Sequence, residues 1–134
     1  MDQISINIPS IPENIRIVES FIDNAKEKFH ISDDIYGNIM VAITEAVNNA
    51  IIHGNKSDEK KMVDLLLTIE KKKIIFTVTD EGNGFDYENL PDPTAPENLE
   101  KIGGRGIFLI KNLSDETEFL EEGKAIKMSF EVES

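Results

Sequence analysis

The spacing of the apolar residues changes twice along this chain, and that change constrains the fold more than any other feature. Isoleucines alternate with polar residues over residues 4–8, which predicts a short half-buried strand. Apolar residues then recur at helical spacing over residues 13–29, and again after Ser32, whose side chain is a plausible N-cap. Gly54 stands where a glycine C′ residue would end this second helix.

Beyond the second helix the apolar residues follow a strand period. Residues 62–70 and 73–79 predict two strands, residues 104–113 a third helix, and residues 117–120 and 125–132 two closing strands. The helices are segregated from a mostly antiparallel series of strands. The expected fold class is therefore α+β: a two-layer sandwich with a mixed, mostly antiparallel sheet covered by helices on one face.

Composition limits the classes of function. The 134 residues predict a single domain, residues 1–134, and the net charge of −12 argues against binding to nucleic acid or to a membrane surface. The absence of cysteine excludes disulfides, a thiolate metal site and a cysteine nucleophile. The start of the chain has no signal-peptide pattern and no apolar run approaches the length of a membrane span, so we expect a cytoplasmic protein.

Three polar residues of the second helix form the first candidate site. Glu45, Asn49 and His53 follow one another at i, i+4 and i+8, and so rise along one stripe that borders the apolar face. An amide oxygen in a cleft suits Mg²⁺, and a carboxylate there can accept a proton from an attacking hydroxyl. The same spacing is also typical of a solvated polar edge, and His53 has the alternative of capping the helix end.

Two glycine-rich segments complete the constellation. Residues 80–85, Asp-Glu-Gly-Asn-Gly-Phe, follow a strand and would let a ligand approach the backbone beside a carboxylate that accepts hydrogen bonds, although they also suit an ordinary turn. Residues 103–106, Gly-Gly-Arg-Gly, begin a helix, where free N–H groups and Arg105 would favour a phosphate. The proline-containing loop 86–103 between them has a length typical of functional or disordered loops.

Together, and in this order, the segments resemble the nucleotide-binding boxes of the Bergerat-fold (GHKL) ATPases, the superfamily of gyrase, Hsp90 chaperones, histidine kinases and MutL. Residues 45–49 resemble the N-box, residues 80–84 the first glycine box and residues 104–106 the second. The helix sequence of residues 44–54 and the segment 104–110 look like the anti-sigma-factor serine kinases, the branch of the bacterial SpoIIAB and RsbW proteins. The resemblance implies the histidine-kinase-like ATPase fold across the whole chain.

The resemblance also implies residue roles and cofactors, namely ATP and Mg²⁺. Glu45 would be the catalytic base, Asn49 would ligate Mg²⁺, and Asp80 would accept a hydrogen bond from the adenine amine. The loop 86–103 would be the ATP lid. The expected nucleotide-binding residues are Asn49, His53, Asp80, Gly82, Gly84, Phe85, Gly104, Arg105 and Gly106.

Partners follow from the same resemblance. The phosphate acceptor would be a serine of an anti-anti-sigma protein of the STAS fold, a sigma factor would be the inhibited client, and a homodimer is usual in the branch. Arg16 stands where the branch has a partner-contacting arginine. Many relatives carry Gly-Thr at the last strand turn, whereas residues 123–125 here read Gly-Lys-Ala and lack that threonine.

Two other functions are open at this point. The chain could be an ATP-switched module that binds a partner without phosphorylating it, or a slow ATPase without a protein acceptor. Glu45 favours the kinase because a pure binding module needs no base.

Overall fold

The computed structural model describes residues 2–82 and 104–132 of the chain. The predicted helices and strands of that part are all present, with ends that differ by a residue or two. In chain order the elements are β1 (Asp2–Pro9), a 3-10 turn (Pro12–Asn14), α1 (Ile15–Phe29), α2 (Asp33–Asn49), a π-helical turn (Ala50–Gly54), β2 (Met62–Ile69), β3 (Lys73–Thr79), α3 (Gly104–Leu113), β4 (Glu116–Leu120), a 3-10 turn (Glu121–Gly123) and β5 (Ala125–Glu131).

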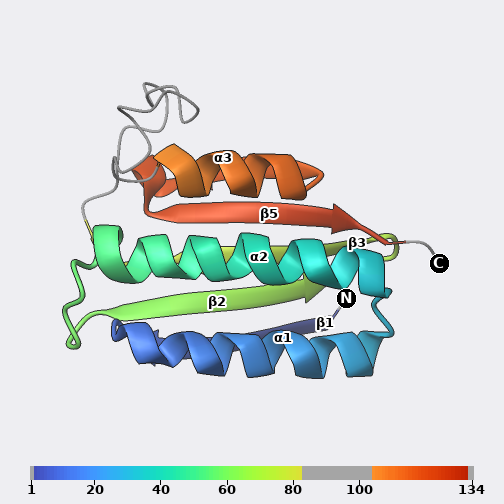
Figure 1. The fold of residues 1–134 in the computed structure, drawn as a ribbon, viewed down its shortest axis with the longest axis horizontal. Helices are drawn as coiled ribbons and strands as arrows, with labels where there is room; N and C mark the ends of the chain where they lie inside the picture. The colour runs from blue at the N-terminus through green and yellow to red at the C-terminus, as the bar shows by residue number, and fades with distance from the viewer. Residues whose placement is uncertain (1, 83–103, 133–134) are drawn as a thin grey trace.

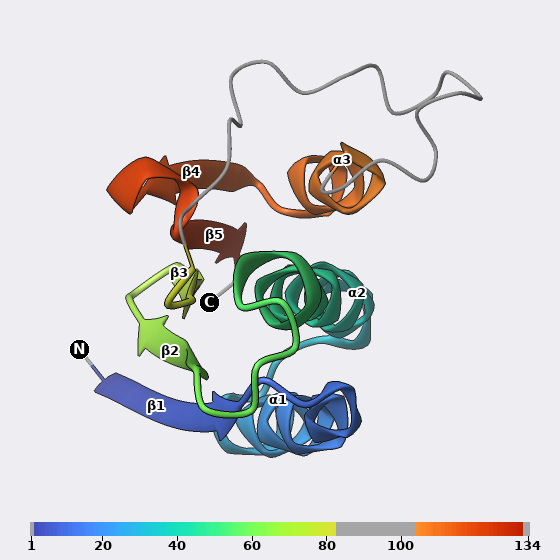
Figure 2. The same ribbon diagram turned by 90° about the vertical axis from the view of Figure 1, so that its left-hand side faces the viewer.

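The described elements form two layers, a five-stranded sheet and three helices that cover one of its faces (Figures 1 and 2). The strand order is β1-β2-β3-β5-β4, and each neighbouring pair is antiparallel. The prediction of an α+β two-layer sandwich is confirmed, with antiparallel pairing throughout the described strands. In the helix layer α2 lies between α1 and α3 (Figure 1).

The core fills the space between the layers. Alternation places every second residue of a strand on the helix side, and these side chains are the apolar ones, such as Leu65, Leu67 and Phe76. The rings of Phe76 and Phe130, on neighbouring strands, meet edge to face with centroids 6.2 Å apart. From the helices, Val18, Ile22, Ile39, Ile43 and Val47 are fully buried against this surface.

The central helix is apolar because it is covered on three sides. The helical segment Asp33–Gly54 consists of α2 and the π-helical turn, and with a mean hydropathy of 1.2 it is long and apolar enough to cross a membrane. The sequence analysis predicted no such segment. Buried residues make up 39% of its most apolar window, and it packs against the sheet and both neighbouring helices. We therefore interpret it as the core helix of the sandwich. The expected N-cap, Ser32, takes the extended N-cap conformation, but its side chain makes no capping hydrogen bond with the described residues.

Candidate functional site

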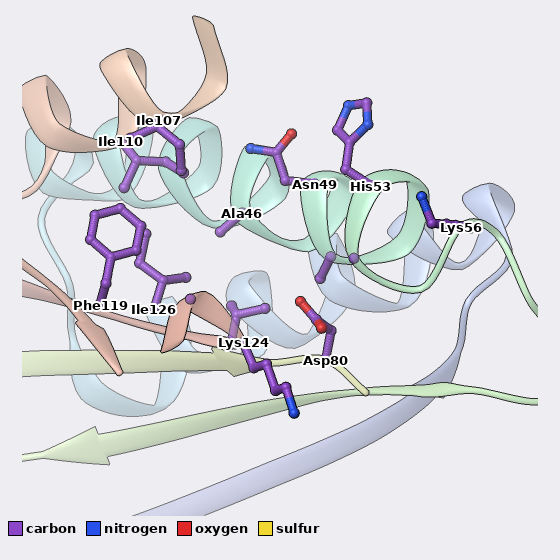
Figure 3. Close-up of a pocket in the computed structure, with 14 residues that line it drawn as sticks. Ala46, Asn49, His53, Lys56, Asp80, Ile107, Ile110, Phe119, Lys124 and Ile126 are labelled. Atoms are coloured by element: carbon purple, nitrogen blue, oxygen red, sulfur yellow. The ribbon is translucent and has the colours of Figure 1, made fainter. Parts of the chain in front are cut away.

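A cleft of about 210 Å³ lies where the end of α2 meets the start of α3 and the adjacent ends of β3 and β5; we call it the α2–α3 cleft (Figure 3). Its floor is apolar and its rim carries a few polar side chains, the composition typical of small-molecule sites. The polar lining residues are Asn49, His53, Lys56, Asp80 and Lys124. The remaining lining residues are Ala46, Ala50, Gly54, Val78, Ile107, Ile110, Phe119, Gly123 and Ile126.

Glu45 and Asn49 meet the first turn of α3 at Gly106. A Cβ atom added to Gly106 would lie 2.6 Å from Asn49 Nδ2 and 3.2 Å from Glu45 Oε2, so only a glycine leaves room for both side chains as they stand. The two residues stack because they are four apart on one helix. The predicted pairing of a carboxylate with an amide beside the second glycine segment is therefore present in the fold.

The amide of Asn49 is buried without a partner. Within the described part of the chain its Nδ2 is the one buried side-chain nitrogen or oxygen that has no hydrogen bond. Burying an amide without a hydrogen bond costs on the order of 1–3 kcal/mol, so such an atom in a cleft points to a ligand. A half-turn of the amide exchanges nitrogen and oxygen, and this position can therefore offer an oxygen to a hard cation.

A cation in this cleft would need more than the protein to hold it. No group of three or more histidine, aspartate or glutamate side chains is arranged as a metal site in the residues that the structure describes. Mg²⁺ is commonly held by one or two protein groups together with substrate phosphates and water. The donor set thus fits a metal that arrives with a nucleotide, and not a free-standing metal centre.

The helix end differs from the prediction at Gly54. We expected a left-handed C′ glycine, but among the described glycines only Gly123 has a positive φ, at 90°. The chain instead widens into a π-helical turn, closed by the N–H of Asn55 donating to the carbonyl oxygen of Ala50 at 2.8 Å. Such turns are frequent at functional sites. Glycine is required at position 54 for space, because a Cβ there would lie 2.4 Å from Asp80 Oδ2.

Asp80 stands half-buried at the base of the cleft. The backbone N–H of Gly82 donates to its Oδ1 at 2.8 Å, whereas Oδ2 has no hydrogen-bond partner within the described residues. Burial raises the pKa of Asp80 above its ordinary value of 3.8, and the Gly82 hydrogen bond and the charges of Lys124 and Lys61 offset this only in part. A fixed carboxylate with one free oxygen is a good acceptor for an amino group.

His53 lines the same cleft one turn beyond Asn49 (Figure 3). Partial burial lowers its pKa below the ordinary value of 6.5, and the positive charge of Lys56 lowers it further. The imidazole is therefore neutral at pH 7 and can accept a hydrogen bond as well as donate one.

For some of the predicted site residues the described structure gives no position in the cleft. Gly84, Phe85 and the expected lid 86–103 lie outside the described residues. Gly104 and Arg105 begin α3, as predicted, but the Arg105 side chain is among the parts left undescribed. Gly82, another member of the predicted set, lies against the π-helical turn. A Cβ atom added there would lie 2.0 Å from the carbonyl oxygen of residue 54.

The predicted partner residue, Arg16, is exposed on α1. That helix flanks α2 on the side away from α3, so Arg16 is separated from the α2–α3 cleft (Figure 1). The position is compatible with contact to another protein and not with contact to the same ligand.

The sequence analysis did not identify the apolar floor of the cleft, or Lys124 as one of the cationic residues that line it. Phe119 and Ile126 come from strands outside the motifs, and the pairing of β4 with β5 brings them together, while α3 adds Ile110. Lys124 lines the cleft at the turn before β5, and its carbonyl oxygen accepts a hydrogen bond from Asp80 N–H at 2.9 Å. The one sequence signal for this turn was Gly123, which takes the left-handed conformation.

The fold and cleft define an ATPase domain of the histidine-kinase-like class, and comparison with known proteins agrees. Residues 8–130 match the model of the histidine kinase-like ATPase domain. The serine-protein kinase RsbW of Staphylococcus epidermidis is 31% identical over 135 residues, which covers 95% of this chain and 85% of that protein. For RsbW of Staphylococcus aureus the identity is 29% over 136 residues, with 96% and 86% covered. The chain therefore belongs to the histidine kinase-like ATPase family, in its RsbW-like branch.

A solved structure gives independent support for the fold. The RsbU and RsbW domains of a Mycobacterium tuberculosis protein superpose on 98% of this chain with a TM-score of 0.67 and 15% sequence identity. This chain covers 32% of that longer protein.

Proposed function

We propose that this protein is an ATP-dependent protein-serine kinase and anti-sigma factor, with Mg²⁺ as its cofactor. The observation that carries the proposal is the meeting of Glu45 and the unpartnered amide of Asn49 at Gly106, beside a cleft that Asn49 lines together with Asp80. A base beside a metal-binding amide is needed for group transfer, whereas a module that only binds nucleotide has no use for the base. Membership of the RsbW-like branch adds to this support.

Each part of the cleft has a task in the proposed reaction. Asp80 would receive the adenine amino group, the apolar floor would stack the base, and Asn49 would hold the metal. Bound Mg²⁺ would neutralise phosphate charge. The N-terminus of α3, which begins at Gly104, presents free N–H groups that favour a phosphate.

In the proposed transfer step Glu45 is the proton acceptor. The acceptor serine oxygen attacks the γ-phosphorus of ATP, and the bond from that phosphorus to the β–γ bridging oxygen breaks. The serine proton passes to the Glu45 carboxylate, and ADP and phosphoserine are the products. Catalysis is chiefly positioning and charge neutralisation, with the base adding about 10²–10⁴-fold.

The proposed partners are proteins. The acceptor is a serine of an anti-anti-sigma protein of the STAS fold, and the client is a sigma factor held partly by Arg16, which is exposed on α1. The net charge of −12 suits a basic partner surface. We also propose a homodimer and a cytoplasmic location, in keeping with the branch.

A transfer assay tests the proposal. The purified protein is mixed with Mg²⁺, ATP labelled at the γ-phosphate, and a STAS-domain protein from the same genome, and label is expected on one serine of that protein. A serine-to-alanine version of the acceptor is the control. Binding of ATP and of the partner without label would favour the switched binding module, and phosphate release indifferent to the partner would favour the slow ATPase.

A further inference from the structure

Asn55, which no motif singled out, is a buried polar junction beside the cleft. It follows the π-helical turn directly and is 1% exposed. Its Oδ1 accepts a hydrogen bond from Glu81 N–H at 2.8 Å. Its Nδ2 donates to the carbonyl oxygen of Met62 at 3.0 Å and to Ser10 Oγ at 2.8 Å. One amide thus joins the end of β1, the start of β2 and the segment after β3 to the end of the central helix.

Further hydrogen bonds support this junction. Ser10 donates from both its N–H and its Oγ to the carbonyl oxygen of Lys61, at 3.1 and 2.7 Å. The Glu81 carboxylate accepts a hydrogen bond from Met62 N–H. Asn55 itself is fixed to the helix by its backbone N–H, which closes the π-helical turn. Because each of these groups has a partner, the Asn55 amide is held in one orientation.

This junction lies beside the residues that fix the position of the Asp80 carboxylate. Glu81 lies between Asp80 and Gly82, and Gly82 N–H fixes Asp80 Oδ1. Gly82 is in turn so close to the backbone of Gly54 that it has no room for a Cβ atom, and a Cβ atom at Gly54 would meet the Asp80 carboxylate. The Asn55–Glu81 hydrogen bond therefore ties the Asp80–Gly82 segment to the residue that closes the π-helical turn, while Asp80 N–H is held on the other side by the carbonyl oxygen of Lys124.

We propose that Asn55 is a positioning residue that sets the preference of the cleft for adenine over guanine nucleotides. It holds Glu81 N–H against the π-helical turn and thereby fixes the Asp80 carboxylate where the adenine amino group meets it. Guanine carries a carbonyl oxygen in place of that amino group, and a fixed carboxylate repels it. The inference rests on the proposed function, because it assumes that ATP binds in the α2–α3 cleft.

Three variants separate positioning from general stability. Asn55→Ala removes the acceptor for Glu81 N–H, whereas Asn55→Asp retains an oxygen there, loses the two amide donors and sets a carboxyl oxygen against the carbonyl oxygen of Met62. Ser10→Ala removes a buried hydrogen bond of the same junction on the side away from Asp80. All three variants should unfold at a lower temperature than the wild type, since each leaves buried polar groups without a partner.

The readout is the ratio of the ATP and GTP dissociation constants, measured by calorimetry with Mg²⁺ on protein that circular dichroism shows to be folded. We expect Asn55→Ala to reduce the preference for ATP about tenfold, and Asn55→Asp and Ser10→Ala to keep it within about twofold. Where Asn55→Ala does not fold, the Asn55→Asp ratio decides, and a folded Asn55→Asp protein that has lost the preference overturns the proposal.

Three further outcomes also count against it. A folded Asn55→Ala protein with the wild-type ratio overturns the positioning role and leaves the proposed function intact, as does a Ser10→Ala protein that loses the preference equally. A wild-type protein that binds neither nucleotide overturns the proposed function and this inference with it.

Discussion

The two ends of α2 border two hollows of opposite character. The α2–α3 cleft measures about 210 Å³, whereas a groove at the other end, which we call the far groove, measures about 820 Å³. The far groove lies between the start of α2, the β2–β3 turn and the ends of α3 and β5. Its lining residues are Phe29, His30, Ile31, Ser32, Asp34, Ile35, Asn38, Lys72, Lys73, Leu113, Asp115, Phe130, Glu131 and Val132.

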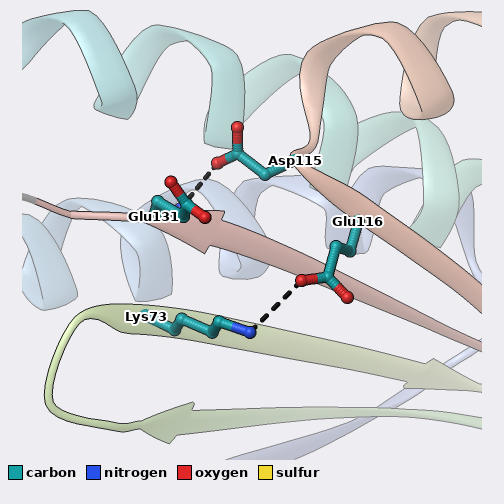
Figure 4. A network of polar contacts seen from close by, with 4 residues as sticks. All are labelled: Lys73, Asp115, Glu116 and Glu131. Atoms are coloured by element: carbon teal, nitrogen blue, oxygen red, sulfur yellow. Dashed lines mark hydrogen bonds and ion pairs between the residues drawn. The ribbon is translucent and has the colours of Figure 1, made fainter.

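Two pairs of polar groups at and beside the far groove are bonded to each other (Figure 4). Lys73 Nζ pairs with Glu116 Oε1 at 3.2 Å, and Asp115 Oδ2 accepts a hydrogen bond from Glu131 N–H at 2.6 Å. The cleft, by contrast, holds the buried amide of Asn49 with no partner among the described residues, and a glycine that leaves room for it. The candidate site is distinguished by a buried polar atom without a hydrogen bond, and not by its volume.

The largest expected effect tests whether the cleft carries the chemistry. Glu45→Gln keeps the shape of the side chain and removes the proton acceptor, so transfer of phosphate to the acceptor protein should fall at least about 100-fold while ATP still binds. Glu116→Gln, at the far groove, should leave the rate unchanged. Radiolabel transfer under single-turnover conditions measures both, and a Glu45→Gln rate near that of the wild type would remove Glu45 from its assigned role.

The second comparison uses two asparagines of the same helix. Asn49 lines the cleft and Asn38 lines the far groove. Asn49→Ala should weaken ATP binding in Mg²⁺ about tenfold or more, and should abolish most of the difference between affinities with and without the metal. Asn38→Ala should change neither value. Calorimetric titration with and without Mg²⁺ measures both, and equal behaviour of the two variants would contradict the ligand role of Asn49.

A third comparison places the same small change on two helices. Gly37 in α2 is exposed and has no atom within 4 Å of an added Cβ, whereas Gly106 in α3 faces Asn49 at 2.6 Å. Gly37→Ala should stabilise the protein by about 0.5–1 kcal/mol through helix propensity. Gly106→Ala should gain the same propensity but displace the Asn49 amide, and so lower ATP affinity several-fold. Thermal melts and titrations measure the two quantities; a Gly106→Ala protein with unchanged affinity would contradict the close contact.

The smallest effect concerns the charge of Asp80. Burial raises the pKa of Asp80 above 3.8, so the folded protein holds this proton more tightly than the unfolded chain. Stability is therefore lost as the pH rises from 3.8 through the raised pKa. Asp80→Asn keeps an acceptor for Gly82 N–H and has no charge to bury. It should raise the melting temperature at pH 7 by on the order of 1–3 °C while weakening ATP binding.

The pH dependence provides the control for this variant. The gain in melting temperature should shrink as the pH falls toward the ordinary carboxyl range, where Asp80 is protonated in both states. Melts by differential scanning calorimetry over a pH series measure it. An Asp80→Asn protein that melts below the wild type at pH 7 would show that the carboxylate is stabilising, contrary to the desolvation argument.

Local patterns in the sequence were sufficient for the elements and for part of the site. Helical spacing placed Glu45, Asn49 and His53 on one stripe, and the fold brings Asn49 and His53 to the cleft with Glu45 beside them. The same reasoning failed at Gly54, where the left-handed cap is replaced by a π-helical turn. The failure has a physical cause, because that glycine is fixed by the approach of Asp80 from a distant strand.

The sequence by itself determined which residues can bind a metal, accept a proton or begin a helix, because these properties depend on side-chain chemistry and on neighbours three or four positions away. The tertiary structure decided which of them meet and which remain unpaired. The packing of α3 on α2 sets Gly106 against Asn49, and the pairing of β3 with β5 brings Lys124 beside Asp80. Desolvation and close contact depend on the whole fold, and no local pattern encodes them.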